Sequence, residues 1–121
     1  MDTEKKGELA KNPEDLSRFF LQRANARDID GLVALYAANA VLSIGEGKVA
    51  VGSEAIRAFY AQLLADRPQF EPGQQQPTLR QGGFALTSTR LTNGLITAEV
   101  ACQQPDGTWL WIIDQPAIAK E

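Results

Sequence analysis

The chain has 121 residues, of which 44% are hydrophobic and 22% are charged, with a formal net charge of −3 at pH 7. These values are typical of one globular domain, and the net charge provides no positive field that would attract nucleic acid. Histidine is absent and Cys102 is the single cysteine, which excludes Ser-His and Cys-His triads, an intrachain disulfide and a cysteine-bound metal. We therefore expect no metal and no other cofactor.

Residues 1–11 mix both signs of charge and show no hydrophobic periodicity. We expect them to form a disordered tail ahead of a domain that spans residues 12–121. The N-terminal segment lacks the apolar region of a signal peptide, and the later apolar runs are too short to cross a bilayer. The sequence therefore predicts a cytoplasmic protein without a membrane partner.

Two helices are predicted before the first strand. Asn12 is the expected N-cap of the first helix, since a proline and two acidic residues follow it directly. The second helix is short, and its apolar stripe runs at helical spacing from Ile29 to Tyr36. Asp28 and Asp30 could form a paired-carboxylate site, but acids at a helix junction more often cap the next helix, and we interpret them so.

A small hairpin and a third helix are predicted next. Residues 40–44 form the expected first strand, 45–48 the turn and 49–51 the return strand. Ser53 is the expected N-cap of the third helix, and Tyr60 lies on the apolar stripe of that helix.

The second half of the chain has the pattern of antiparallel strands that follow a loop at residues 67–77. The expected long strands are 84–92, 95–104 and 108–118. Asn93-Gly94 and Asp106-Gly107 separate them and are typical of type I′ hairpin turns, in which both central residues have positive φ. Helices followed by hairpins indicate an α+β fold, with three N-terminal helices packed on a curved, mostly antiparallel sheet.

Both faces of the last predicted strand are largely apolar. Strict alternation would place its side chains in two sets, Trp109, Trp111 and Ile113 on one face and Leu110, Ile112 and Asp114 on the other. An antiparallel sheet with one solvated face should alternate apolar and polar residues instead. We therefore expect a second protein surface to cover the tryptophan face, and we predict a symmetric homodimer.

Several stretches resemble the NTF2-like superfamily over about residues 13–118. The segment from Asn25 to Ala40 (NARDIDGLVALYAANA) is similar to the end of the first helix and the second helix of bacterial ketosteroid isomerases. Gly52 to Tyr60 (GSEAIRAFY) is similar to the start of their third helix. The closing segment QPDGTWLWIIDQP looks like the final strands of SnoaL-like proteins. The resemblance implies an NTF2-like cone.

The same resemblance implies roles for three residues. Ketosteroid isomerases use a carboxylate base on the first strand, and their oxyanion hole combines a tyrosine of the first helix with a protonated aspartic acid. Asp114 matches that aspartic acid, and Tyr36 and Tyr60 match tyrosines that support the network in some members.

Two further positions have lost the chemistry of the isomerases. Phe20 replaces the first-helix tyrosine and cannot donate a hydrogen bond. The position of the base falls on Ile44, or on Ser43 if the one-residue alignment gap in the hairpin is placed earlier. Glu46 is the nearest carboxylate, but it lies in the predicted turn. Since general-base catalysis contributes roughly 10²–10⁴-fold, we do not expect ketosteroid isomerase activity.

Two interpretations of Asp114 are open. It can share an apolar pocket with Leu110 and Ile112, which would raise its pKa and leave it protonated as a donor. Alternatively it lies near the strand's exit and pairs with Arg90 or a backbone amide. Tyr36 and Tyr60 are expected to pack in the core, where their hydroxyl groups would need partners.

The leading hypothesis is a binding protein for a small apolar ligand, with one polar anchor at Asp114. The candidate ligand-binding residues are Phe20, Tyr36, Ile44, Tyr60 and Asp114. The alternative is an isomerase, cyclase or lyase that uses Asp114 as acid or base together with Tyr36 or Tyr60. A third hypothesis is a purely structural dimerisation domain, because NTF2-like domains also serve in assembly and this fold hosts unrelated activities.

Overall fold

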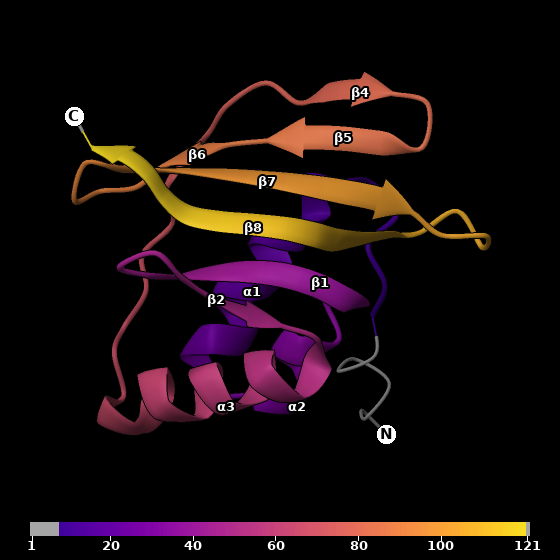
Figure 1. The fold of residues 1–121 in the computed structure, drawn as a ribbon. Coiled ribbons are helices and arrows are strands. Elements are labelled where there is room, and N and C mark those ends of the chain that lie inside the picture. Colours follow the sequence, from indigo (N-terminus) through magenta and orange to yellow (C-terminus); the bar gives the residue numbers. More distant parts are fainter. Residues whose placement is uncertain (1–7, 121) are drawn as a thin grey trace.

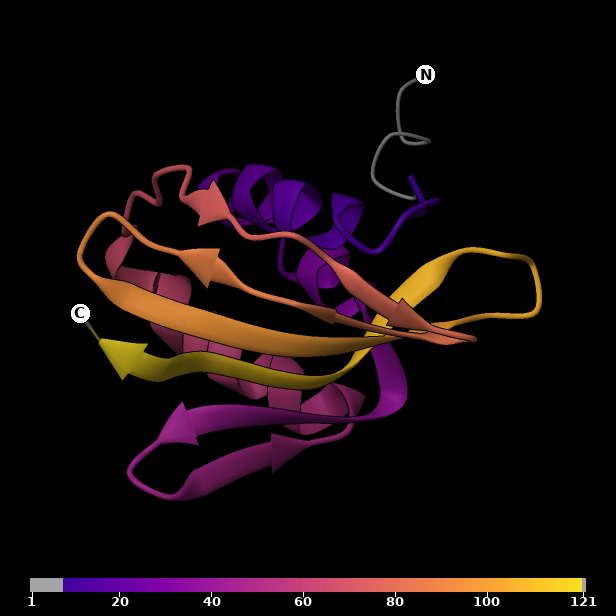
Figure 2. The ribbon, with the colours of Figure 1, turned by 90° about the horizontal axis from the view of Figure 1, so that it is seen from above.

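The computed structural model describes residues 8–120, in which helices cover one face of a curved sheet (Figures 1 and 2). The helices are α1 (Asp15–Asn25), α2 (Ile29–Val33) and α3 (Ser53–Leu63), and a single 3-10 turn, η2 (Leu64–Asp66), extends α3. The strands are β1 (Tyr36–Gly45), β2 (Lys48–Val51), β3 (Gln74–Gln75), β4 (Leu79–Gln81), β5 (Phe84–Thr87), β6 (Thr89–Arg90), β7 (Leu95–Gln103) and β8 (Trp109–Lys120). The α+β fold predicted from the sequence is confirmed.

The strands form one sheet in the order β2-β1-β8-β7-β5-β4, and β6 pairs with both β7 and β3. The β1–β8 pair is parallel and the other pairs are antiparallel. The strand predicted over residues 84–92 is divided into β5 and β6 at Ser88. Helix α3 packs against β1 and β2, and α1 packs against β8, so the helices and the concave face of the sheet enclose the core.

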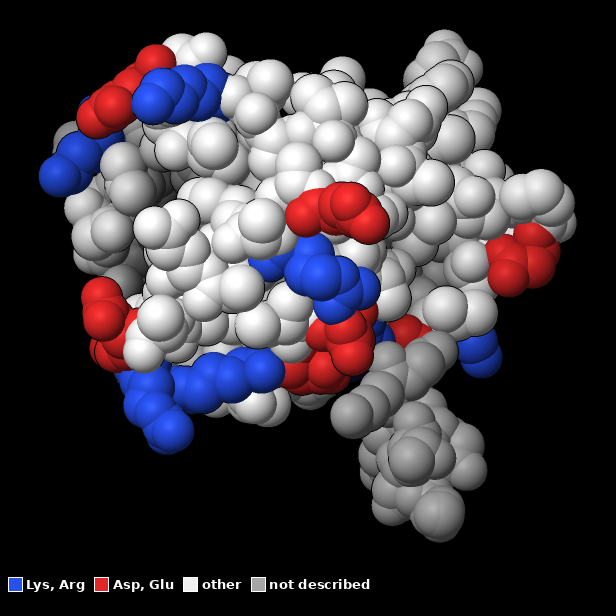
Figure 3. Space-filling model, turned by 60° about the horizontal axis from the view of Figure 1, so that its bottom comes forward, with Lys and Arg blue, Asp and Glu red and all other residues white. Residues whose placement is uncertain are grey.

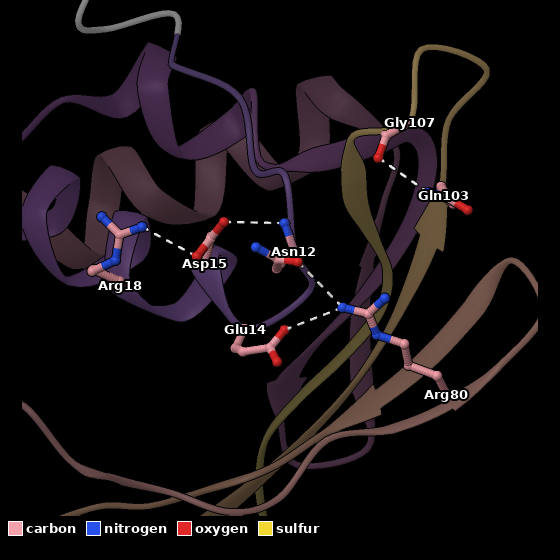
Figure 4. Close-up of polar contacts among 7 residues, drawn as sticks. All are labelled: Asn12, Glu14, Asp15, Arg18, Arg80, Gln103 and Gly107. Carbon is pink, nitrogen blue, oxygen red and sulfur yellow. Dashed lines mark hydrogen bonds and ion pairs between the residues drawn. The ribbon is translucent and has the colours of Figure 1, made fainter.

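The start of α1 differs from the prediction. Asn12 is not its N-cap, because the helix begins at Asp15 after a turn. The Asp15 carboxylate accepts hydrogen bonds from the Asn12 backbone N–H at 3.0 Å and from Arg18 at 3.1 Å (Figure 4). Arg80 of β4 reaches Asn12 Oδ1 at 3.4 Å and Glu14 at 3.8 Å, and therefore ties the sheet edge to the start of the helix.

The packed part of the chain begins earlier than residue 12. Ala10 is buried, and its carbonyl accepts a hydrogen bond of 2.9 Å from the Trp109 N–H. The Glu8 carbonyl accepts one of 2.7 Å from Arg23. The predicted tail boundary is therefore too late, because backbone pairing with β8 orders this segment. The rest of the predicted tail, residues 1–7, lies outside the described residues.

The second helix is capped as predicted but is shorter than its apolar stripe. The Asp28 carboxylate accepts a hydrogen bond of 2.9 Å from the Gly31 N–H. The helix ends at Val33, and Tyr36 is the first residue of β1, where it pairs with Trp111 of β8. Tertiary strand pairing therefore overrides the helical spacing at Tyr36.

The third helix also begins differently from the prediction. Ser53 is its first helical residue, and Gly52 occupies the N-cap position, with no side-chain hydrogen bond to the cap. Gly52 has φ of 89°, a backbone conformation that side-chain-bearing residues rarely adopt. Its N–H donates a hydrogen bond of 2.9 Å to the Ala40 carbonyl, so the strand beside it fixes this entry geometry.

The two C-terminal hairpins lie where they were predicted, but their turns are not type I′. Positive φ falls on the glycines, 90° at Gly94 and 88° at Gly107, and not on Asn93 or Asp106. Asn93 and Asp106 instead use their side chains to accept hydrogen bonds from the backbone two residues ahead, at 3.0 and 2.9 Å. This side-chain bonding stabilises a type I turn followed by a glycine, the usual three-residue hairpin loop.

A β-bulge in β8 changes the faces of the last strand. Ala101 of β7 pairs with Trp111, whereas the preceding Val100 pairs with Ile113, so Ile112 is an extra residue on β8. Strict alternation is broken there, and Asp114 faces the same side as Trp111. The predicted grouping of Asp114 with Leu110 and Ile112 is therefore wrong.

The tryptophans lie on the helix side of the sheet rather than at an interface. Trp109 and Trp111 are only 2% and 4% exposed in the single chain. The Arg80 guanidinium stacks over the Trp109 ring at 5.4 Å. The prediction that the tryptophan face forms a dimer interface is therefore wrong, because the helices of the same chain already cover it.

The outer face of the sheet carries a continuous apolar row instead. Its members pair in register across six strands: Val51, Val41, Ile113, Val100, Leu86 and Leu79. Both ends and the middle of this outer row are open to solvent, with Leu79 65%, Ile113 50% and Val51 57% exposed. An apolar row of this length on an open sheet face is a candidate contact surface.

Charged residues do not form a single field on the face shown in Figure 3. Lysines and arginines lie beside aspartates and glutamates there, with uncharged surface between the clusters. Within the described part of the chain, no helix is long and apolar enough to cross a membrane.

We expect Asp28→Ala to lower the free energy of unfolding by about 1 kcal/mol, because the Gly31 N–H at the start of α2 loses its acceptor. Urea denaturation of both proteins measures the change. Asp30→Ala is the matched control, since Asp30 is 84% exposed and its ion pair with Arg57 contributes little. Equal losses in the two variants would contradict the capping role of Asp28.

Candidate functional site

The centre of the candidate site is a chain of hydrogen bonds between three buried side chains. The Tyr36 hydroxyl donates to Asp114 Oδ2 at 2.6 Å, and the Tyr60 and Tyr36 hydroxyl oxygens are 2.6 Å apart. Because a tyrosine has one O–H proton, Tyr36 uses its proton on Asp114 and accepts the proton of Tyr60. The structure therefore brings together three of the five residues proposed from the sequence.

Three different secondary-structure elements position these hydrogen-bonded side chains. Tyr60 lies on the buried face of α3, Tyr36 begins β1, and Asp114 follows the bulge in β8. Asp114 pairs in register with Leu42 of β1 and is only 6% exposed. Asp114 is therefore an interior group with a defined partner, rather than a group at the rim of the sheet.

The site shifts the pKa of each of its members. The pKa of Asp114 is raised to about 7, mainly by burial; the hydrogen bond from Tyr36 opposes this shift, and the negative charge of Glu99 adds to it. Burial and the nearby Asp114 charge also raise the pKa of Tyr36 and of Tyr60. Of the three hydrogen-bonded residues, Asp114 is the one that can exchange a proton near neutral pH.

Glu99 is a second buried carboxyl group, which the sequence analysis missed. It is the register partner of Asp114 on β7 and is 6% exposed. The Thr87 hydroxyl donates to Glu99 Oε1 at 2.7 Å. Burial raises the pKa of Glu99, and hydrogen bonds from Thr97 and Thr87 oppose that shift.

The sequence held only a weak signal for Glu99. On β7 it alternates with apolar residues, a pattern that usually places the polar side chains in solvent. Here the polar set, Thr97 and Glu99, faces the helices, because the apolar set faces outward along the outer row. Knowledge that Glu99 pairs with Asp114 in the sheet would have been needed to reverse the assignment.

Aromatic rings form a wall beside the hydrogen-bond chain. The Phe20 ring of α1 lies 6.1 Å from the Tyr60 ring, 5.7 Å from the Phe70 ring and 6.3 Å from the Trp111 ring, measured between centroids. Phe20 and Phe70 are partly exposed. The Asn25 side-chain amide holds Phe70 in place, because it donates to the Phe70 carbonyl at 3.0 Å and accepts from the Phe70 backbone N–H at 2.8 Å. Phe20 therefore joins the site as an apolar wall residue.

Ile44 lies on β1, two residues beyond Leu42, and packs partly buried against the core. Glu46 is exposed in the turn between β1 and β2, as predicted. None of the residues of β1 carries a carboxyl group. In ketosteroid isomerases this strand supplies the base, whereas here it offers the site the Tyr36 hydroxyl and no carboxylate.

A shallow hollow of about 210 Å³ lies elsewhere, at the β4–β5 hairpin. It is lined by Leu79, Arg80, Gln81, Phe84, Ala85, Leu86 and Val100. None of the five proposed ligand-binding residues contributes to it, and Leu79, Leu86 and Val100 belong to the outer row. We assign this hollow to the outer face of the sheet rather than to the candidate site.

Among residues 8–120, no cluster of three or more aspartate, glutamate, histidine or cysteine side chains could hold a metal ion. Glu99 and Asp114 are two carboxyl groups that pair in register on neighbouring strands. Hydrogen bonding and proton exchange are chemistry that these two groups can supply.

Comparisons with known proteins agree with the fold. The family model of the SnoaL-like domain matches residues 16–118. A solved structure from Thiobacillus denitrificans, described as a putative calcium/calmodulin-dependent protein kinase type II association domain, has a TM-score of 0.74 at 17% identity and covers 89% of this chain and 95% of that one. A ketosteroid isomerase-like protein from Erwinia carotovora has a TM-score of 0.61 at 19% identity, with coverage of 84% and 88%.

A SnoaL-like protein of unknown function from Burkholderia thailandensis has a TM-score of 0.58 at 21% identity and covers 84% of this chain and 89% of that one. No curated protein matches the sequence. At these identities the solved structures establish a shared fold and leave the activity to be argued from the site.

We expect the stability of the protein to fall as the pH rises from about 4 to about 7. Burial raises the Asp114 pKa from 3.8 to about 7, so the folded protein keeps a proton that the unfolded chain has already lost. Each pH unit in that window costs about 1.4 kcal/mol for one such group. Urea denaturation across this pH range measures the slope.

Asp114→Asn should reduce that slope and leave a smaller one of the same sign from Glu99, whose pKa is also raised. Asp30→Asn, at an exposed position, is the control and should keep the wild-type slope. If Asp114→Asn also keeps it, Asp114 is not the titrating group.

Proposed function

This chain belongs to the SnoaL-like domain family, and from that premise we propose that it binds a small, largely apolar molecule through one polar anchor, Asp114. The observation that supports the proposal most directly is the hydrogen-bond chain from Tyr60 through Tyr36 to Asp114, buried beside an aromatic wall. The wall offers apolar contact, and the carboxyl group offers a single directional interaction. Sites for small molecules usually combine these two features.

The geometry of the anchor supports this role. Tyr36 occupies Asp114 Oδ2, so Oδ1 is the oxygen that would face a ligand. A protonated Asp114 could donate from Oδ1 to an acceptor, whereas an ionised Asp114 could only accept. With a pKa of about 7, the anchor would change between these two states near neutral pH.

A second candidate function is acid–base catalysis by an isomerase, cyclase or lyase. The observation that favours it is the pair of buried carboxyl groups, Glu99 and Asp114, at adjacent positions in the ladder. Two such groups can share one proton, so that one serves as acid and the other as base. Phe20 and Ile44 count against it, because neither can donate or accept a proton. Binding therefore stands first.

We also propose that the protein works as a homodimer in which a second copy covers the outer row. A self-complementary apolar row that spans the sheet suits the twofold interface of a symmetric dimer. The similar Thiobacillus denitrificans structure is described as an association domain, which is consistent with assembly through this fold.

Binding can be tested with prodan, an apolar fluorescent naphthalene whose acyl carbonyl is an acceptor. We expect wild-type protein to bind it and to lose affinity as the pH rises through about 7, because only protonated Asp114 can donate. Asp114→Asn should bind without this pH step, since its amide donates at every pH. Asp114→Leu should weaken binding by roughly tenfold below pH 7, the loss expected for one hydrogen bond. Fluorescence titration at several pH values measures all three.

Glu46→Gln is the control for the change of charge, since Glu46 is an exposed carboxylate of the β1–β2 turn. It should bind prodan as wild type does. The proposed function is wrong if wild-type protein does not bind prodan, or if Asp114→Leu binds it as tightly as wild type.

Ile113→Lys should convert the dimer to a monomer, because Ile113 lies in the middle of the outer row and a buried lysine would have no partner there. Light scattering after gel filtration measures the mass of each variant. Leu63→Lys is the matched control, an exposed apolar position on α3 away from the row, and should remain dimeric. A monomeric wild-type protein would rule out the dimer.

A further inference from the structure

Trp111 carries a buried hydrogen-bond donor without a protein partner. Its side chain is 4% exposed, and among residues 8–120 its indole Nε1 has no hydrogen-bond partner. Arg27 Nε is also unpaired, but the Arg27 guanidinium donates through Nη1 to the Asn25 carbonyl at 2.7 Å. An indole has one N–H, so Trp111 has no second donor to compensate. Nearly all buried donors in folded proteins are paired, and this exception needs an explanation.

The unpaired donor belongs to the wall of the proposed site. The Trp111 ring lies 5.3 Å from the ring of Tyr36 and 6.3 Å from the ring of Phe20, measured between centroids. Tyr36 is the residue that holds Asp114. The bulge at Ile112 places Trp111 and Asp114 on the same face of β8. The indole N–H and the carboxyl anchor therefore lie in the same region of the interior.

Packing does not account for an indole at this position. A phenylalanine would present a similar aromatic face to Tyr36 and Phe20 without a buried polar atom. Burying an N–H group without an acceptor is unfavourable. The group is readily explained if an acceptor from outside the chain reaches it.

We propose that the Trp111 indole N–H is a second ligand anchor, and that the ligand presents to it a hydrogen-bond acceptor of the carbonyl class. This inference rests on the proposed function, since it specifies the chemistry of the ligand at the same site. Indole nitrogen donates and cannot accept, so an ammonium or amine N–H of the ligand cannot occupy this position. Phe20 and Phe70 then contact the apolar body of the ligand. An apolar ketone, aldehyde or lactone meets both requirements.

The test compares two probes that differ in the carbonyl group. One is prodan, and the other is the same dimethylaminonaphthalene without the acyl group. Each is titrated into wild-type protein, Trp111→Phe and Trp109→Phe. Trp109 is the matched control, because it is an equally buried tryptophan of β8 that lies beside Ala10 and Arg80, away from Tyr36.

We expect Trp111→Phe to weaken prodan binding by roughly tenfold, the effect of one lost hydrogen bond, and to change the affinity of the probe without a carbonyl by less than about twofold. Trp109→Phe should leave the ratio of the two affinities unchanged. If Trp111→Phe alters both probes equally or neither, the inference is overturned while the binding function stands. If wild-type protein does not bind prodan, the proposed function itself fails.

A second measurement observes the wild-type protein directly and needs a variant only to assign the signals. The protein has two tryptophans, so its NMR spectrum contains two indole N–H signals, which Trp109→Phe assigns. Prodan should move the Trp111 indole proton downfield, and the probe without the carbonyl should not. Equal shifts with both probes would mean that the carbonyl does not reach Nε1, as when a water molecule occupies that donor, and would overturn the inference.

Discussion

The extra residue in β8 determines where the chemistry of this protein lies. Ile112 adds one residue between the Trp111–Ala101 and Ile113–Val100 pairs, and this offset turns Asp114 toward the helices. Without it, alternation would direct the carboxyl group to the outer face, where the apolar row runs. Burial then raises the Asp114 pKa to about 7, and Tyr36 stands within hydrogen-bonding distance. A local irregularity of one strand therefore creates a titratable group in the interior.

The concave face is unusual for its polar content. Thr87, Thr97, Glu99 and Asp114 are all buried there, on the face of the sheet that also carries Trp111. Polar groups in such a position cost stability unless they are bonded, and here Tyr36 and Thr87 supply the bonds. A purely structural core would be more stable with apolar residues at these positions. The polar set is consistent with a site whose function offsets the loss of stability.

The two faces of the sheet have opposite roles. The inner face carries the buried polar groups and the tryptophans, whereas the outer face carries the apolar row from Val51 to Leu79. This division explains why β7 has its polar residues inside, against the usual pattern of an antiparallel sheet. It also separates the proposed ligand site from the proposed dimer contact. The effect of a substitution on one face can therefore be assigned to the role proposed for that face.

Local patterns in the sequence determined the elements of this protein. Turn residues located the hairpins, Asp28 marked the start of α2, and the resemblance to NTF2-like proteins brought Tyr36, Tyr60 and Asp114 to attention before their contacts were known. Tertiary structure alone decided which way the side chains face. The bulge at Ile112 comes from pairing with β7, and the inward Glu99 follows from the apolar outer row. Both depend on residues distant in sequence, and no local period contains that information.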